Sequence, residues 1–168
     1  MTTNRAAPEF ESKICPPHEL ASRLKGAPRP LVFTNGVFDI LHRGHVTYLA
    51  RASALGASLV VALNSDASVR RLGKGADRPL NPLSDRLAVV AALECVSAVT
   101  WFEEDTPLAT IGVVRPDVLV KGGDWKPEAI VGASETLARG GTVHSIAFEH
   151  PVSTTELLKR IRQSNPDS

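Results

Sequence analysis

The sequence predicts an α/β fold, because short apolar runs of strand length alternate with longer amphipathic stretches of helix length. The expected strands are Leu31–Thr34, Leu59–Asn64, Ala98–Phe102, Val118–Val120 and Val143–Phe148. Such short, mostly apolar runs are typical of parallel strands that helices cover on both faces. We therefore expect a Rossmann-like three-layer sandwich with a five-stranded parallel sheet of order 3-2-1-4-5.

Helices are expected between these strands, at positions marked by residues that favour helix ends. The expected helices are His18–Lys25, Gly44–Leu55, Asp85–Glu94, a helix opened by Thr106–Pro107, Pro127–Arg139 and a last helix from Ser153. Gly56 is a stop signal for the second, and Ser84 can cap the third. The run Ser153–Glu156 has the spacing of a capping box. The residues of the last helix expected to face inward are Leu157, Leu158 and Ile161.

The length of 168 residues suits one domain with its own core, which we expect over residues 30–163. Residues 1–29 are expected to form a tail and a short helix, and residues 164–168 a frayed tail. Hydrophobic residues at 43% and charged residues at 22% are close to globular averages. This composition disfavours a disordered chain, a collagen-like fibre and a coiled coil.

The formal net charge of +1 provides no overall attraction to nucleic acid or to an anionic membrane, so neither is an expected partner. Cys15 and Cys95 form no C-x-x-C pair, which favours a reducing, cytoplasmic location. The apolar runs fall well short of the roughly 18 residues that span a bilayer. The segment Met1–Ser12 has no apolar core of the kind found in signal peptides.

The segment Thr34–His45 carries the strongest functional signal, because it is a polar, glycine-bearing turn between a strand and a helix. His42 and His45 lie three residues apart, with Gly44 at the expected helix start. A helix start offers unpaired N–H groups and a positive dipole end, and imidazoles add donors for a phosphate. The alternatives are a zinc pair or two surface histidines. The zinc interpretation lacks a third clustered ligand.

This turn resembles the signature of the nucleotidyltransferase superfamily with an H-x-G-H motif, and of its cytidylyltransferase-like branch. The branch pattern G-x-F-D-x-x-H-x-G-H is matched by Gly36, Phe38, Asp39, His42, Gly44 and His45. The S-T-T motif of the family occurs as Ser153, Thr154 and Thr155, although a capping box alone also explains that run. The resemblance extends from Leu31 to Arg162 and implies a nucleotidyltransferase domain over residues 30–163.

Within that branch, three further segments resemble the heptose 1-phosphate adenylyltransferases, in a form without an attached kinase. They are Asn64–Ser68, Phe102–Pro107 and Leu119–Asp124. The resemblance implies adenylyl transfer from ATP, with Mg²⁺, to the sugar 1-phosphate D-glycero-D-manno-heptose 1-phosphate. The products would be pyrophosphate and ADP-heptose for the lipopolysaccharide core, and the enzyme would be a homodimer.

Two alternative functions stay open at this point. One is a cytidylyltransferase that acts on glycerol phosphate or a related alcohol phosphate, and the other is a non-catalytic nucleotide sensor. The segment Phe148–Val152 lacks the Arg and E-G-I pattern that precedes S-T-T in glycerol-phosphate cytidylyltransferases, which favours ATP.

From the motif and the resemblance we expect His42 and His45 to be catalytic. The residues expected to bind nucleotide or phosphate are Asn35, Gly36, Phe38, Gly44, Lys74, Arg78, Arg86, Lys121, Gly122, Asp124, Ser153, Thr154 and Thr155. Asp39 and Asp66 are expected to bind the sugar, and no side chain is expected to bind a metal.

Several of these positions have a structural alternative. Arg86 lies in the first turn of an expected helix, where the dipole disfavours a cation, so it is either paired with an anion or simply exposed. Asp39 can cap its own turn, Asp66 can cap a helix, and Lys121 can form an ion pair. Lys74 and Arg78 lie in a segment that is either a basic loop closing over the triphosphate or a solvated connector.

Overall fold

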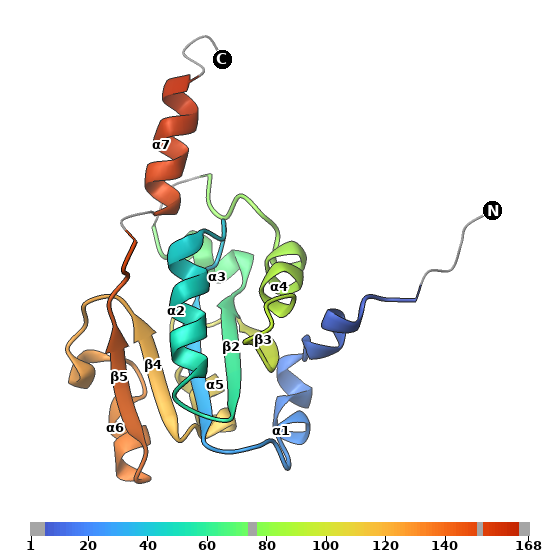
Figure 1. Ribbon diagram of the computed structural model, residues 1–168, viewed down its shortest axis with the longest axis vertical. Helices are drawn as coiled ribbons and strands as arrows, with labels where there is room; N and C mark the ends of the chain where they lie inside the picture. The colour runs from blue at the N-terminus through green and yellow to red at the C-terminus, as the bar shows by residue number, and fades with distance from the viewer. Residues whose placement is uncertain (1–5, 74–76, 151–152, 165–168) are drawn as a thin grey trace.

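The computed structural model describes residues 6–73, 77–150 and 153–164 and shows a parallel five-stranded sheet between two layers of helices (Figure 1). The strands are β1 Leu31–Gly36, β2 Ser58–Asn64, β3 Ala98–Phe102, β4 Val118–Gly122 and β5 Thr142–Ile146. They are hydrogen-bonded in the order β3-β2-β1-β4-β5. The predicted fold class and strand order are therefore confirmed.

The helices follow the strands in the expected alternation. The α-helices are α1 Leu20–Arg23, α2 Arg43–Ser53, α3 Asp66–Arg71, α4 Leu83–Ala91, α5 Leu108–Val114, α6 Ala133–Ala138 and α7 Thr154–Ser164. Three 3-10 turns accompany them: η1 Glu9–Lys13, η2 Pro17–Glu19 and η3 Pro127–Ala129. None of the helices in the described part of the chain has the length and apolar content needed to cross a membrane.

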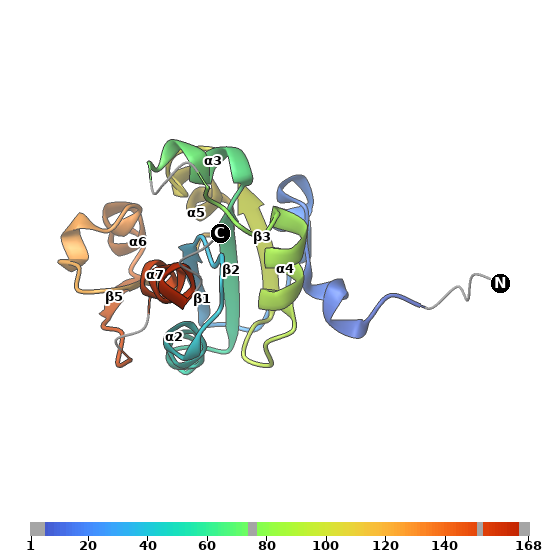
Figure 2. The same cartoon turned by 90° about the horizontal axis from the view of Figure 1, so that it is seen from above.

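Strand side chains alternate between two cores, as the period of two in a strand requires. Val32 of β1 packs into the core under α2 and α4, whereas Phe33 packs into the core under α1, α5 and α6. The view from above shows the sheet between these groups of helices (Figure 2). Because β1 pairs with both β2 and β4, its end lies at the switch point, where ligands bind in open α/β sheets.

Four local expectations about helices are wrong. The expected helix over Pro127–Arg139 is divided into η3 and α6, because Gly132 has φ 85° and a Cβ there would lie 2.7 Å from Ile111 Cδ1. Pro82, not Ser84, is the N-cap of α4, and Pro107, not Thr106, is the N-cap of α5.

The fourth concerns α7, whose apolar residues do not point into the core. This helix extends away from the sheet at the upper end of the molecule (Figure 1), and Ile161 is 58% exposed. Leu157 and Leu158 are half-buried. The sequence shows that a helix has an apolar side but not which surface that side meets.

The N-terminal segment covers one edge of the sheet. Ile14 forms a parallel bridge with Val99 of β3, and the N–H of Cys15 donates to the carbonyl of Val99 at 2.8 Å. Residues 6–25 therefore contribute to the described fold rather than forming a loose tail. Residues 1–5 and 165–168 lie outside the described part of the chain.

Candidate active site

His42 and His45 are brought together by the turn from β1 to α2. His42 is the N-cap of α2 with an extended backbone, and His45 lies in the first turn. Their rings stack, with centroids 3.9 Å apart and an angle of 29° between the planes. The N–H groups of His45 and Val46 donate to the His42 carbonyl at 2.9 and 3.2 Å, so the free donors expected at this helix start are those of Arg43 and Gly44. Two imidazoles and a helix start thus present donors from one place.

Gly44 allows this stacking. A Cβ at position 44 would lie 3.0 Å from both Cε1 and Nδ1 of His42, tighter than ordinary contact. Any side chain there would displace the His42 ring from the helix start. Packing against His42 therefore requires a glycine in H-x-G-H. The close approach of a phosphate to the backbone, which the sequence indicates, is a second reason for it.

Burial keeps both imidazoles neutral at neutral pH. Desolvation lowers the pKa of His45 from 6.5 to about 4, with a further lowering from nearby His42 and an opposing effect of the Ile40 carbonyl. Desolvation also lowers the pKa of His42. The Nδ1 atoms of both rings are buried and meet no aligned hydrogen-bond partner among the described residues, although the Ile40 carbonyl lies near the His45 ring. Buried polar atoms in folded proteins usually have a hydrogen-bond partner, which the protein, water or a ligand supplies.

The S-T-T run lies at the start of α7, next to this turn. Ser153 Oγ accepts from the N–H of Glu156 at 3.1 Å, as an N-cap does. Thr154 Oγ1 donates to the Ile40 carbonyl at 3.4 Å, which connects α7 to the turn before His42. The two motifs, far apart in sequence, therefore meet in the fold.

A cavity of about 860 Å³, here called the histidine cavity, opens between these motifs. It is lined by Val37, Phe38, Asp39, His42, His45, Arg78, Phe148, His150, Ser153, Thr154, Thr155 and Glu156. Phe38 and the S-T-T residues thus line the same cavity as the two histidines. Sequence reasoning did not select Val37, Phe148, His150 or Glu156.

Asp39 makes its contacts within the protein rather than presenting a free carboxylate to a sugar. Its Oδ1 accepts from the N–H groups of Leu80 and Asn81, both at 2.9 Å. Its Oδ2 lies 2.7 Å from Arg78 Nε, close enough for an ion pair although the hydrogen is not aligned for a hydrogen bond. The Asp39 side chain is fully buried. The expectation that Asp39 binds sugar is corrected: it holds residues 78–81 against the turn.

Arg86 is likewise buried, and its side chain has no exposed surface. Its guanidinium donates to the carbonyls of Val37, Asn64 and Asn81 and to Oδ1 of Asp66 at 2.7 Å. Of the two alternatives for Arg86, pairing with an anion is the one observed, and in this structure that anion is Asp66. The same contact engages Oδ1 of Asp66, which lines neither the histidine cavity nor the cavity at the ends of β1 and β4, and its expected sugar role stays a prediction. We call Asp39, Asp66, Arg78 and Arg86 the charge network.

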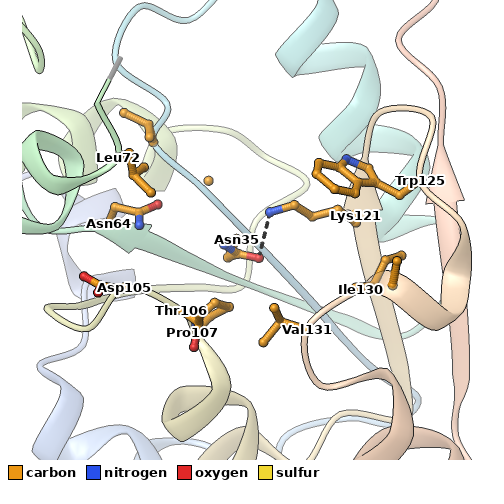
Figure 3. Close-up of a pocket in the computed structure, with 13 residues that line it drawn as sticks. Asn35, Asn64, Leu72, Asp105, Thr106, Pro107, Lys121, Trp125, Ile130 and Val131 are labelled. Atoms are coloured by element: carbon orange, nitrogen blue, oxygen red, sulfur yellow. Dashed lines mark hydrogen bonds between the residues drawn. The ribbon is translucent and has the colours of Figure 1, made fainter. Parts of the chain in front are cut away.

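A second cavity, of about 260 Å³, lies at the ends of β1 and β4 and is here called the lysine cavity (Figure 3). Lys121 Nζ donates to Asn35 Oδ1 at 3.2 Å, and Trp125 lies beside Lys121. The lining residues are Asn35, Gly36, Val37, Asn64, Leu72, Asp105, Thr106, Pro107, Lys121, Trp125, Ala129, Ile130 and Val131. Val37 lines both cavities, so the two open from the same turn.

Two other expected residues, Gly122 and Asp124, line neither cavity. Asp124 is exposed. Gly122 lies under Phe148 and Tyr48, since a Cβ there would be 2.8 Å from Phe148 Cζ. Lys74 lies outside the described residues. Within the described chain, no group of three His, Cys, Asp or Glu side chains is arranged to hold a metal ion.

Comparison with known sequences places the chain among nucleotidyltransferases. A model of the cytidylyltransferase-like family matches residues 33–160. The chain is 58% identical over 156 residues to the D-beta-D-heptose 1-phosphate adenylyltransferase of Bordetella bronchiseptica, a match that covers 92% of this chain and 96% of that protein. It is 55% identical over 146 residues to the bifunctional protein HldE of Cronobacter sakazakii, covering 87% of this chain. It spans 30% of the length of that bifunctional relative.

Solved structures agree with the fold. The lipopolysaccharide core biosynthesis protein from Thermoplasma volcanium is 33% identical, with a TM-score of 0.59, covering 73% of this chain and 98% of that chain. The pantoate-beta-alanine ligase from Francisella tularensis has a TM-score of 0.56 over 92% of this chain and 79% of its own. Its 13% identity makes it evidence for the fold alone.

Proposed function

The chain belongs to the cytidylyltransferase-like family, and from this premise we propose that it is a heptose 1-phosphate adenylyltransferase. In this reaction a phosphate oxygen of D-glycero-D-manno-heptose 1-phosphate attacks the α-phosphorus of ATP. The bond from that phosphorus to the bridging oxygen of the pyrophosphate breaks. The products are ADP-heptose, a precursor of the lipopolysaccharide core, and pyrophosphate. The 58% identity to the Bordetella adenylyltransferase over nearly the whole of both chains supports this substrate pair.

The observation that carries the mechanism is the stacked pair of imidazoles beside the helix start, both of which line the histidine cavity. The sugar phosphate is already ionised, so the reaction needs no general base. What it needs is donors aimed at the charge that gathers as pyrophosphate leaves. His42, His45 and the first N–H groups of α2 supply them, and the S-T-T hydroxyls lie in the same cavity for the outer phosphates.

We assign the triphosphate to the histidine cavity and the heptose phosphate to the lysine cavity. Lys121 supplies a cation for the sugar phosphate there. The side chains of Asn35, Asn64 and Thr106 supply polar partners for hydroxyl groups, and Trp125 an apolar surface for the sugar ring. Because Val37 lines both cavities, the two phosphates would meet at this turn.

Mg²⁺ would enter with ATP, bound by phosphate oxygens, as part of the substrate. The protein's own contribution is then positioning and hydrogen bonding. We propose a cytoplasmic homodimer; the free thiols of Cys15 and Cys95 fit a reducing compartment. Light scattering at several protein concentrations tests the dimer.

Pyrophosphate release tests the function directly. ATP with D-glycero-D-manno-heptose 1-phosphate should give turnover, and CTP should have a kcat/KM at least about tenfold lower. Preferred use of CTP with glycerol phosphate would instead show a cytidylyltransferase. Nucleotide binding without release, across a panel of sugar and alcohol phosphates, would show a sensor.

A further inference from the structure

Phe148 presents a half-exposed aromatic ring to the histidine cavity. The residue lies just after the end of β5 and is 45% exposed, although its neighbours in this cavity are mainly polar. A large apolar side chain kept open to solvent inside a polar cavity suggests a ligand surface.

The ring is held in place from behind. Its centroid lies 6.3 Å from that of His45, edge to face at 89°, and 5.6 Å from that of Tyr48. Tyr48 is itself buried and hydrogen-bonded to Thr34 of β1. Gly122 of β4 leaves the space that the tip of the Phe148 ring fills. The exposed part of the ring is therefore a fixed surface supported by two central strands.

The position of this surface relative to the imidazoles limits what it can bind. If the triphosphate lies on His42 and His45, the ribose separates the base from the α-phosphorus, so a base platform must stand beside the imidazoles. Phe148 stands there, in edge contact with His45. Every base has a π face, and a purine offers a larger one than a pyrimidine.

Resting on the function proposed above, we propose that Phe148 is the stacking platform for the nucleotide base and favours a purine over a pyrimidine nucleotide. The ring contributes to binding of the base and not to binding of the phosphates. This separation distinguishes it from a ring that merely supports His45.

The test compares Phe148→Leu and Phe148→Trp with the wild type in calorimetric binding of a non-hydrolysable ATP analogue, the CTP analogue and inorganic tripolyphosphate. Phe148→Leu should weaken binding of the ATP analogue roughly five- to thirtyfold. It should change tripolyphosphate binding less than about twofold and reduce the preference for the ATP analogue over the CTP analogue. Phe148→Trp should retain most of the affinity for the ATP analogue. Leu137→Ala, at a 53% exposed position outside both cavities, is the control variant.

Equal weakening of the ATP analogue and tripolyphosphate in Phe148→Leu would overturn the proposal, because the ring would then act through His45. Unchanged binding of both would overturn it as well. Circular dichroism melts of each variant establish that it is folded. Absence of turnover in the wild type would contradict the proposed function. The binding affinities of the Phe148 variants and the wild type could still be compared, because they do not depend on turnover.

Discussion

The histidine pair and the charge network both lie at the carboxyl ends of the strands, but their polar groups differ in hydrogen bonding. In the network, Arg86 has four acceptors and no exposed surface. In the pair, the Nδ1 atoms of His42 and His45 are buried without a partner in the described chain. A buried polar group left unpaired costs about 1–3 kcal/mol. The polar groups of the network therefore hold the turn in shape, whereas the two imidazoles face the histidine cavity.

The largest effect is expected at Arg86, the centre of the charge network. Arg86→Met should lower the free energy of unfolding by about 3–5 kcal/mol, because it leaves Asp66 and three carbonyls without their donor. Urea denaturation measures this loss. Arg51→Met, which removes an exposed ion pair with Glu149, is the control and should cost at most about 1 kcal/mol.

A stable Arg86→Met protein with a raised KM for ATP would contradict this account. It would return Arg86 to the phosphate-binding role that its sequence position suggested.

The next effect is expected at His45, with the opposite pattern. His45→Ala should lower kcat by about 10² to 10³, or roughly 3 to 4 kcal/mol of transition-state stabilisation, and leave stability near pH 7 almost unchanged. Steady-state kinetics and a thermal melt on the same sample measure both. His18→Ala, at a side chain 79% exposed, is the matched control. An unfolded variant whose folded fraction keeps its specific activity would make His45 a core residue.

Arg78 belongs to both regions. It pairs with Asp39 and also lines the histidine cavity. Arg78→Ala should raise the KM for ATP roughly ten- to a hundredfold, as expected for loss of a charge-assisted contact of about 1.5–3 kcal/mol. The change in kcat should be smaller, since the phosphates are charged in both ground and transition states. Kinetics at fixed ionic strength with saturating sugar phosphate test this.

Unchanged kinetics in a Lys74→Ala, Arg78→Ala double variant would contradict the phosphate role of this segment. Residues 77–81 would then be a connector held in place by Asp39.

The smallest effect is a pH dependence of stability that comes from His45. Its pKa is about 4 in the folded protein against 6.5 for an ordinary histidine. Between these values the unfolded chain binds a proton that the folded chain does not, so stability falls as pH drops from 6.5 towards 4. Above this window His45 is neutral in both states and contributes no slope.

Urea midpoints near pH 7 and near pH 5 should therefore differ less in His45→Gln than in the wild type. His18→Gln serves as the exposed control. An identical pH dependence in His45→Gln and the wild type would assign the slope to other groups.

The sequence predicted the parts of this molecule that depend on local pattern. The alternation of apolar runs and amphipathic stretches predicted the strand order, since crossovers and the switch point leave few arrangements. The spacing of His42, Gly44 and His45 predicted that two imidazoles and a helix start meet, as they do. That a phosphate binds there stays a prediction.

Partners contributed by distant segments could not be predicted. Arg86 shows a cation in an unfavourable helix turn, but its acceptors come from Val37, Asn64, Asp66 and Asn81, in separate loops and strand ends. The position of Phe148 could not be predicted for a related reason. A single aromatic residue after a strand shows neither its neighbours nor its exposure until the chain is folded.

The bridge between Ile14 and Val99 has a consequence for solubility. Open strand edges are templates on which further chains can add, and the N-terminal segment occupies the edge of β3 at this point. A shortened chain that begins after Pro16 would lack both Ile14 and the buried Cys15, and would leave that edge uncovered. Such a chain would tend to aggregate by adding strands from other molecules, increasingly so at higher protein concentration. This aggregation would not involve the candidate active site.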